Sequence, residues 1–431
     1  MDRDTQPLTT RELLDLREGG RAQLVDVRPI DAYNGWRLGG EPRGGHITGA
    51  RTLPFKWSSY LDWIEIVRSK GIRDDAPLVV YGYDRGQTDL VARQFRRAGH
   101  HDVRAYHHFV EEWSPETTLP MERLARYKRL VPPEWLHQII TTGSAPEHDG
   151  RRVVVCHAHY RETGDYAEGH IPSAVGLDTN ALESSETWNR RSPDEVRDAL
   201  LAHGITADTT VVLYGRFSFP DNADPFPGSS AGQIAAFRCA FILLWAGVQD
   251  VRVLNGGMQS WLDAGFDAST VPEHPSPAER FGAEIPAAPE LAVDLPEARR
   301  ILAASDANLV CVRSWPEYIG ETSGYHYIEK KGRIPGSVFA DCGSDAYHME
   351  NYRNLDHTTR EYGEIVETWR KAGITPDKHN AFYCGTGWRG SEAFFNAWLL
   401  GWPRVSVYDG GWYEWSSDDA NPIATGVPAD S

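Results

Sequence analysis

Three segments of the chain share one pattern, and this repeat constrains the fold more than any other feature of the sequence. The segments are GIRDDAPLVVYG (71–82), GITADTTVVLYG (204–215) and GITPDKHNAFYC (373–384). Each begins with a Gly-Ile pair and ends in a short run of β-branched and aromatic residues. A glycine follows the first and third segments at equal spacing, and a loop-like insertion, FSFPDNADPFPGSS, delays it in the second.

The agreement between the copies extends upstream of these segments. A strand-like run opens each copy: LVDVR (24–28), VVVCHA (153–158) and LVCVR (309–313). Each run leads to a related turn, which reads GHITGA, GHIPSA or GRIPGS. Because agreement in so many registers does not arise by chance, we predict that the chain holds three copies of one structural unit.

Each copy alternates short β-branched runs, bounded by turn residues, with helical stretches. This alternation predicts an α/β fold in which every unit is a mostly parallel sheet flanked by helices. A length of 431 residues suits three domains of ordinary size. We place these domains at residues 1–122, 123–276 and 277–431, with linkers at 115–127 and 271–280.

Composition and charge exclude several classes of protein. A net charge of -17 argues against general nucleic-acid binding, which needs a basic face. No run approaches the roughly 18 apolar residues of a membrane span, and the N-terminus lacks the pattern of a signal peptide. Five widely spaced cysteines argue against a disulfide framework and against CxxC sites. We therefore expect a cytoplasmic protein without nucleic-acid or membrane partners.

Cys384 ends the third repeated segment and is followed by a glycine-containing loop and an amphipathic helix, CGTGWRGSEAFFNAWLLGW. In the order strand, loop, helix, successive backbone N–H groups and the positive end of the helix form a bowl that binds anions. Gly385 and Gly387 allow the backbone to curve round the sulfur, and Arg389 adds a fixed positive charge. Such a bowl favours the thiolate, which is the nucleophilic form of cysteine.

With this loop and three repeats, the chain resembles the rhodanese sulfurtransferases, especially their three-domain members. The loop from Cys384 to Arg389 is similar to the family's active-site loop, C-x-x-G-x-[RT], which Gly387 and Arg389 match. A related phosphatase branch has five residues between the cysteine and the arginine, whereas four stand here, which suits a single sulfur rather than a phosphate. Gly82 and Gly215 replace the cysteine in the other copies, so the resemblance implies that the first two domains are non-catalytic.

The resemblance implies a sulfurtransferase that takes a sulfane sulfur from thiosulfate or 3-mercaptopyruvate as a persulfide on Cys384. The acceptor would be a thiophilic molecule such as a thiol or cyanide, or a sulfur-acceptor protein, and no metal or other cofactor is expected. The residues expected to hold persulfide and substrate are Gly385, Thr386, Gly387, Trp388, Arg389, Arg313, Arg190 and Arg191. The alternative is a non-enzymatic rhodanese-fold scaffold or sulfur-relay docking protein.

Several roles stay open on the sequence alone. Arg389 and Arg313 would contact the substrate or form structural ion pairs. Arg190 and Arg191 would reach the cleft from the second domain and hold a carboxylate, or form a solvated charge pair. Trp388 would line the pocket or pack beneath it.

Three cysteines also stay open. Asp26 opens the first copy, but Cys156 and Cys311 stand at its place in the other two, so the bracing made by the aspartate must be replaced there. Cys342 would either resolve the persulfide as a disulfide or be an incidental buried thiol.

Overall fold

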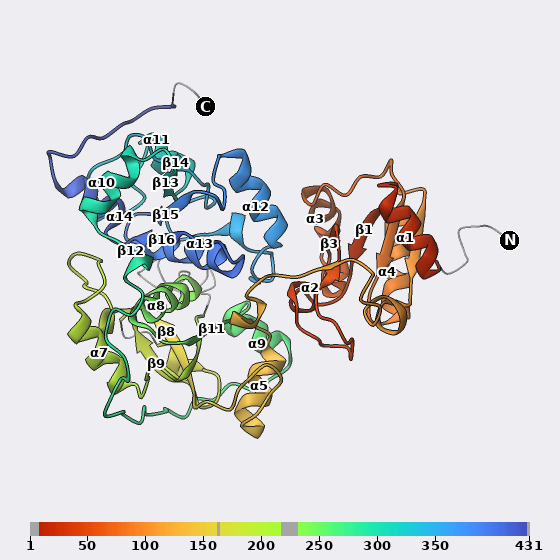
Figure 1. The fold of residues 1–431 in the computed structure, drawn as a ribbon, viewed down its shortest axis with the longest axis horizontal. Coiled ribbons are helices and arrows are strands. Elements are labelled where there is room, and N and C mark those ends of the chain that lie inside the picture. The colour runs from red at the N-terminus through yellow and green to blue at the C-terminus, as the bar shows by residue number, and fades with distance from the viewer. Residues whose placement is uncertain (1–7, 162–163, 217–231, 429–431) are drawn as a thin grey trace. The chain divides into compact units, whose positions relative to one another are not determined.

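The computed structural model describes residues 8–161, 164–216 and 232–428 (Figure 1). The chain divides into two compact units, residues 1–128 and 129–431. The predicted α/β architecture is confirmed, because each repeat forms a parallel sheet flanked by helices. The domain limits 1–122, 123–276 and 277–431 stay a prediction.

The first unit is built on a parallel four-stranded sheet in the order β3-β1-β4-β5. Apolar side chains cover both faces, because neighbouring residues along a strand point to opposite sides: Val25 and Val80 enter one cluster, Leu24 and Val79 the other. The strands are β1 (Gln23–Asp26), β3 (Ala50–Thr52), β4 (Leu78–Tyr81) and β5 (Val103–Tyr106), with the antiparallel pair β2 (His46–Ile47) and β6 (Met121–Glu122). The α-helices are α1 (Thr10–Glu18), α2 (Ile30–Asn34), α3 (Trp63–Ser69) and α4 (Arg85–Arg97).

The second unit holds two parallel five-stranded sheets with the same strand order. The sheet of the second domain runs β7-β11-β10-β8-β9, and that of the third runs β12-β16-β15-β13-β14. The strands are β7 (Leu130–Val131), β8 (Val153–His159), β9 (Val175–Asp178), β10 (Thr210–Tyr214), β11 (Asp250–Leu254), β12 (Ala292–Val293), β13 (Ala307–Cys311), β14 (Val338–Phe339), β15 (His379–Tyr383) and β16 (Val405–Tyr408). The matching order is the structural counterpart of the sequence repeat.

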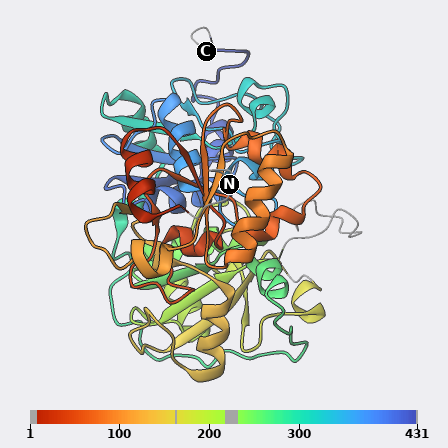
Figure 2. The ribbon, with the colours of Figure 1, turned by 90° about the vertical axis from the view of Figure 1, so that its right-hand side faces the viewer.

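Helices cover both sheets of the second unit (Figure 1 and Figure 2). Those of the second domain are α5 (Pro133–Thr142), α6 (Asp165–Glu168), α7 (Pro193–Ala202), α8 (Gly232–Ala246) and α9 (Gly257–Asp263). Those of the third domain are α10 (Leu295–Ala303), α11 (Trp315–Ile319), α12 (Tyr362–Lys371), α13 (Trp388–Leu399) and α14 (Gly411–Ser417).

Helices α8 and α13 pack against each other and join the second domain to the third (Figure 1). Phe237 lies 5.4 Å from Phe395, and Phe241 lies 5.6 Å from Phe394, measured between ring centroids. Helix α8 is mostly apolar around its circumference, with Gln233 and Arg238 as buried exceptions, because it lies between its own sheet and α13. Within the described ranges, no helix is long and apolar enough to cross a bilayer.

Candidate active site

Cys384 directly follows β15, the middle strand of the third sheet, and residues 384–387 connect that strand to α13. Two hydrogen bonds from α14 anchor the start of the loop. The N–H of Trp412 donates to the carbonyl oxygen of Cys384 at 2.8 Å, and the N–H of Tyr413 donates to that of Gly385 at 2.9 Å. The cysteine therefore stands at the carboxyl edge of a parallel sheet, where α/β folds bind ligands.

The conformation of the loop exposes backbone donors. Gly387 has a φ of 84°, in the left-handed region that glycine adopts without steric cost. A side chain there would lie 2.7 Å from the carbonyl oxygen of Asp409 and 3.0 Å from Nη1 of Arg238. The N–H groups from Gly385 to Arg389 find no hydrogen-bond acceptor among the described residues. These groups are donors for a negatively charged sulfur.

Arg389 is buried beneath the loop and forms a two-pronged ion pair with Glu317 of α11, with N–O distances of 2.8 and 2.9 Å. Burial opposes ionisation of Glu317, but Arg389 outweighs this effect and lowers the pKa of the carboxyl. Arg389 also donates to the Oη of Tyr325 at 2.8 Å and lies 3.1 Å from the Sγ of Cys342. Its contacts are those of a brace under the loop.

Tyr325 lies directly over the loop, since a Cβ added to Gly385 would come within 2.1 Å of its ring. Its Oη accepts a hydrogen bond from Arg389, so the phenol O–H must point elsewhere. Burial raises the pKa of Tyr325 well above its ordinary value, so this proton is retained. Thr386 is buried beside Tyr327.

Arg313 is fully buried and makes only structural contacts within the described chain. Its Nε lies 3.3 Å from the Sγ of Cys311, and its Nη2 donates to the carbonyl oxygen of Gly332 at 2.7 Å. In the first domain, Arg28 contacts Asp26 and a glycine carbonyl in the same way. The thiol of Cys311 therefore replaces the carboxylate that braces this arginine elsewhere.

Arg190 and Arg191 have carboxylate partners within the chain. Arg190 spans the two domains, donating to Asp409 at 2.9 Å and to Asp294 at 3.0 Å. Arg191 pairs with Glu195 on its own domain at 3.0 Å. Only Arg190 of these two arginines contacts the third domain, where it neutralises the buried carboxylate of Asp409.

The thiol of Cys342 is buried, and this burial raises its pKa to about 12. Burial likewise raises the pKa of Cys156 to about 12. All five cysteines are free and buried. Cys342 therefore lies close to the loop without being ionised, which favours its interpretation as a packed thiol.

A buried charge cluster at the junction of the two domains was not predicted. Glu183 accepts hydrogen bonds from the indole Nε1 of Trp388 at 2.9 and 3.1 Å, and from the Nε of Arg238 at 2.7 Å. Arg238 also pairs with Asp409 at 2.6 Å and donates to the carbonyl oxygen of Trp188 at 2.8 Å. Burial raises the pKa of Glu183 to about 7 in spite of Arg238.

A continuous set of aromatic rings lies beside the loop, and we call it the aromatic wall. Its members come from both domains: Tyr160, Trp188, Tyr325, Tyr327, Tyr347, Trp388 and Tyr413. Trp188 of the second domain stacks on Tyr327 of the third at 5.3 Å between centroids. The sequence offered little signal for the wall, because its members are scattered and only Tyr325 and Tyr327 stand close together.

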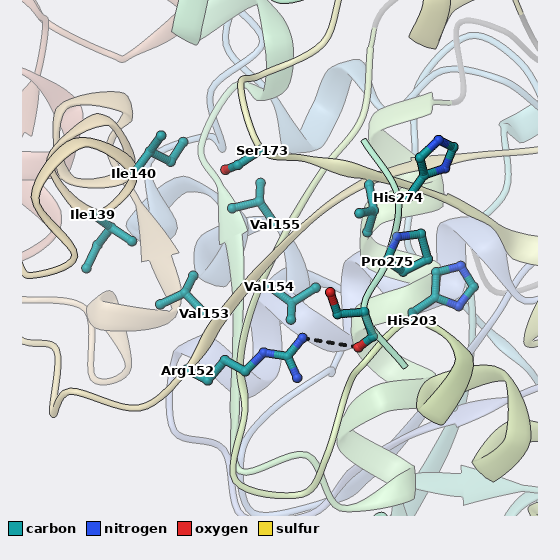
Figure 3. A pocket seen from close by; sticks show the side chains of 12 residues that line it. Ile139, Ile140, Arg152, Val153, Val154, Val155, Ser173, His203, His274 and Pro275 are labelled. Carbon is teal, nitrogen blue, oxygen red and sulfur yellow. Dashed lines mark hydrogen bonds between the residues drawn. The ribbon is translucent and has the colours of Figure 1, made fainter. Parts of the chain in front are cut away.

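A cavity of about 280 Å³ lies elsewhere, in the second domain, between α5, the start of β8 and residues 274–276 (Figure 3). Arg152 borders it and donates to carbonyl oxygens of Gly204 and Ser276. Its floor is made by aliphatic residues, among them Ile139, Val153 and Val155. Because it adjoins the amino end of β8, this cavity is separate from the site at the carboxyl end of β15.

Comparison with known proteins agrees with the threefold repeat. A model described as "Rhodanese-like domain" matches residues 9–116, 134–264 and 294–418. The thiosulfate sulfurtransferase YnjE of Escherichia coli (strain K12) is 39% identical over 426 residues, which cover 98% of this chain and 92% of YnjE.

Two solved structures are similar over almost the whole chain. One is an anaerobic ergothioneine biosynthesis enzyme from Chlorobium limicola in complex with its natural substrate, trimethyl histidine. The other is a variant of EanB with a persulfide on its cysteine, in a tetrahedral intermediate state with ergothioneine. Each is 58% identical, covers 98% of this chain and 100% of the other, and has a TM-score of 0.96.

Variants of EanB have been solved with substitutions at a tyrosine, a threonine and two cysteines. Each substituted position lies at a fixed distance in sequence from the cysteine of EanB that carries the persulfide. At the same distances from Cys384, this chain has residues of the same types, which are Tyr325, Thr386, Cys311 and Cys342.

Proposed function

The chain is a sulfurtransferase of the rhodanese family, and from this premise we propose that Cys384 carries a sulfane sulfur as a persulfide and transfers it to the imidazole ring of a trimethylated histidine. The acceptor of the 58% identical Chlorobium enzyme supports this proposal. The observation on this chain that carries it is the aromatic wall beside the Cys384 loop.

In the first half-reaction, the thiolate of Cys384 attacks the outer sulfur of a donor such as thiosulfate or 3-mercaptopyruvate. The bond from that sulfur to the rest of the donor breaks, and sulfite or pyruvate leaves. The free N–H groups from Gly385 to Arg389 would bind the negative charge of the persulfide. Donor preference stays open between these two compounds.

In the second half-reaction, the terminal sulfur of the persulfide bonds to the ring carbon between the two imidazole nitrogens. Tyr325 donates its proton to a ring nitrogen, which makes this carbon electrophilic. The carbon then gives its own proton to the Tyr325 phenolate, the electron pair forms the carbon–sulfur double bond, and the sulfur–sulfur bond breaks to return the thiolate of Cys384. A carbon–hydrogen bond is thus oxidised while the persulfide is reduced.

The aromatic wall matches the charged end of such an acceptor. A trimethylammonium group cannot donate hydrogen bonds, and proteins bind it against the faces of tryptophan and tyrosine rings. Trp188, Trp388 and Tyr160 supply such faces, with centroid separations of 5.6 Å from Tyr160 to Trp188 and 5.9 Å from Tyr160 to Trp388. Thiosulfate and cyanide have no group that needs this wall.

The proposal is tested in two steps on the purified protein. Incubation with thiosulfate or 3-mercaptopyruvate should add one sulfur atom to the intact mass, and Cys384→Ala should remove this gain. Addition of trimethylated histidine to the loaded protein should then return the mass to its starting value and yield the thiolated acceptor. Loading followed by transfer only to cyanide or thiols would refute the proposed acceptor.

A second candidate function is transfer to a thiol, to cyanide or to an acceptor protein. The 39% identity with YnjE, a thiosulfate sulfurtransferase, favours it. It shares the first half-reaction and differs only in the acceptor, so the same loaded protein separates the two candidates.

A further inference from the structure

Glu183 reaches the active-site loop from the second domain, which has glycine where the third domain has its cysteine. Its side chain is fully buried, and both carboxylate oxygens lie within hydrogen-bond distance of the Trp388 indole N–H. Trp388 is the first residue of α13 and belongs to the loop that holds Cys384. A carboxylate of one domain therefore fixes a ring of the other.

Glu183 also acts on the second tryptophan of the wall, through Arg238. The Nε of Arg238 binds Glu183, and its Nη2 donates to the carbonyl oxygen of Trp188. Trp188 has a φ of 60°, a left-handed conformation that is unfavourable for a bulky residue. Such a conformation persists only where surrounding contacts impose it, and the bond from Arg238 is one of them.

The segment 183–190, which we call the Trp188 loop, is closed at both ends and bound to the third domain. A β-bridge joins Glu183 to Arg190, and Arg190 pairs with Asp409 of the third domain. Asn189 donates to Glu414 of α14 at 3.2 Å. These contacts hold both ends of the Trp188 loop, so Trp188 is kept in place against Tyr327. Glu183 is the first residue of this loop.

We propose that Glu183 is a positioning residue for sulfur transfer, holding Trp388 directly and Trp188 through Arg238 so that the two indoles face the cationic end of the acceptor. Glu183 does not touch the reacting atoms. The identity of the acceptor is taken from the proposed function. The contacts of Glu183 with Trp388 and Arg238 are independent of that function.

The kinetic test compares Glu183→Ala, Glu183→Gln and a matched control, Glu186→Ala, an exposed glutamate of the same loop. Glu183→Ala should raise the KM for trimethylated histidine at least about 10-fold and leave persulfide loading of Cys384 within about twofold. Glu183→Gln, which still accepts a hydrogen bond from the indole, should stay within about threefold of the parent, and Glu186→Ala should equal the parent. Equal losses in loading and transfer, or no loss in either, would overturn the proposal.

A double-mutant cycle with Trp388→Phe tests whether Glu183 acts through the indole N–H. In the Trp388→Phe background, Glu183→Ala should have a clearly smaller effect on KM than in the parent, because the contact is already lost. If the increase in KM of the double variant equals the product of the increases of the two single variants, the proposal is contradicted.

A third measurement is independent of the acceptor. In protein labelled with 5-fluorotryptophan, the ¹⁹F signals of Trp188 and Trp388, assigned by their substitution with phenylalanine, should both move in Glu183→Ala and stay in place in Glu186→Ala. Unmoved signals would overturn the inference. If the parent protein fails to transfer sulfur to trimethylated histidine while these signals move, the proposed acceptor is wrong and the positioning by Glu183 stands.

Discussion

Arg389 is paired with Glu317 and lies against the hydroxyl of Tyr325, whereas the sequence left open whether it contacts the substrate or forms a structural ion pair. The guanidinium is neutralised by Glu317 and turns a further N–H to the phenol oxygen of Tyr325. The phenol is thereby left with one proton to donate and a raised pKa that retains it. At the scale of the residue, the loop arginine holds the phenol oxygen of Tyr325, which is the acid of the proposed reaction.

Tyr325→Phe removes the proton donor and leaves the ring that packs on Gly385. We expect persulfide loading of Cys384 to stay within about twofold, and transfer to trimethylated histidine to fall by about 100-fold or more, the usual contribution of a general acid. Single-turnover measurements of the two half-reactions would show this. An unchanged rate of transfer would contradict the role of Tyr325 as the acid, and equal losses in both steps would show that the hydroxyl supports the whole loop.

Glu183 should also make stability depend on pH. Burial raises its pKa from 4.5 to about 7, so between these values the folded protein holds a proton that the unfolded chain releases. Its contribution is fully present below pH 4.5 and is lost as the pH rises through about 7, by up to about 3 kcal/mol. Urea unfolding at about pH 5 and about pH 7.5 should show a smaller decrease for Glu183→Gln than for the parent. Equal pH dependence in the two proteins would contradict this assignment.

At the scale of the element, the end of the middle strand is held in the same way in the second domain, where glycine stands in place of Cys384. In the second domain the N–H of Met258 donates to the carbonyl oxygen of Gly215 at 3.0 Å, just as Trp412 donates to Cys384 in the third. Helices α9 and α14 thus hold the residue that follows the middle strand, Gly215 or Cys384, in the same way. This contact is common to both domains, whereas the cysteine is present only in the third.

Gly387 lies close to the backbone of Asp409, so we expect Gly387→Ala to distort the Cys384 loop. Alanine there would adopt a left-handed φ and would meet the carbonyl oxygen of Asp409, so we expect a loss of about 2–3 kcal/mol in stability and at least a 10-fold slower loading of Cys384.

Gly373 provides a matched control, because its φ is 74° and no atom lies within 4 Å of an added Cβ. Gly373→Ala should cost about 1 kcal/mol and leave loading unchanged. Thermal unfolding and the mass gain with thiosulfate measure both effects. Similar loading rates for the two variants would show that the close approach at Gly387 is unimportant.

At the scale of the whole molecule, the second domain takes part in the site although glycine stands at its own nucleophile position. It contributes Glu183, Arg238, Tyr160 and Trp188, and α8 packs on the helix that follows the catalytic loop. A buried cluster of two arginines and two carboxylates resists separation of the domains, because removing one partner leaves an unpaired buried charge. The second and third domains therefore act as one body.

Residues 129–431, expressed alone, should fold and load sulfur, because the core of this unit and every site residue named above lie within it. We expect a single cooperative unfolding transition and a mass gain with thiosulfate close to that of the full chain. Two separate transitions for the second and third domains would contradict the picture of one body. Arg238→Ala should lower the transition temperature of this fragment, and a fragment that is folded but cannot be loaded would show that the first 128 residues are needed.

The sequence by itself determined the threefold α/β repeat and the family, because these depend on local patterns of strand runs and turn glycines. It also indicated the proposed nucleophile, Cys384, as the one cysteine at the end of a repeated strand segment. Tertiary structure alone decided what surrounds that nucleophile. Tyr325 lies 59 residues before Cys384 and Glu183 in another domain, and nothing in the local pattern joins them. For Arg190 and Arg389 the sequence left a choice between substrate contact and a charge pair, and packing supplied the carboxylate partners Asp409 and Glu317. The fold follows from patterns within short segments, whereas the proposed acceptor site depends on charges and aromatic rings that the second and third domains bury at their junction.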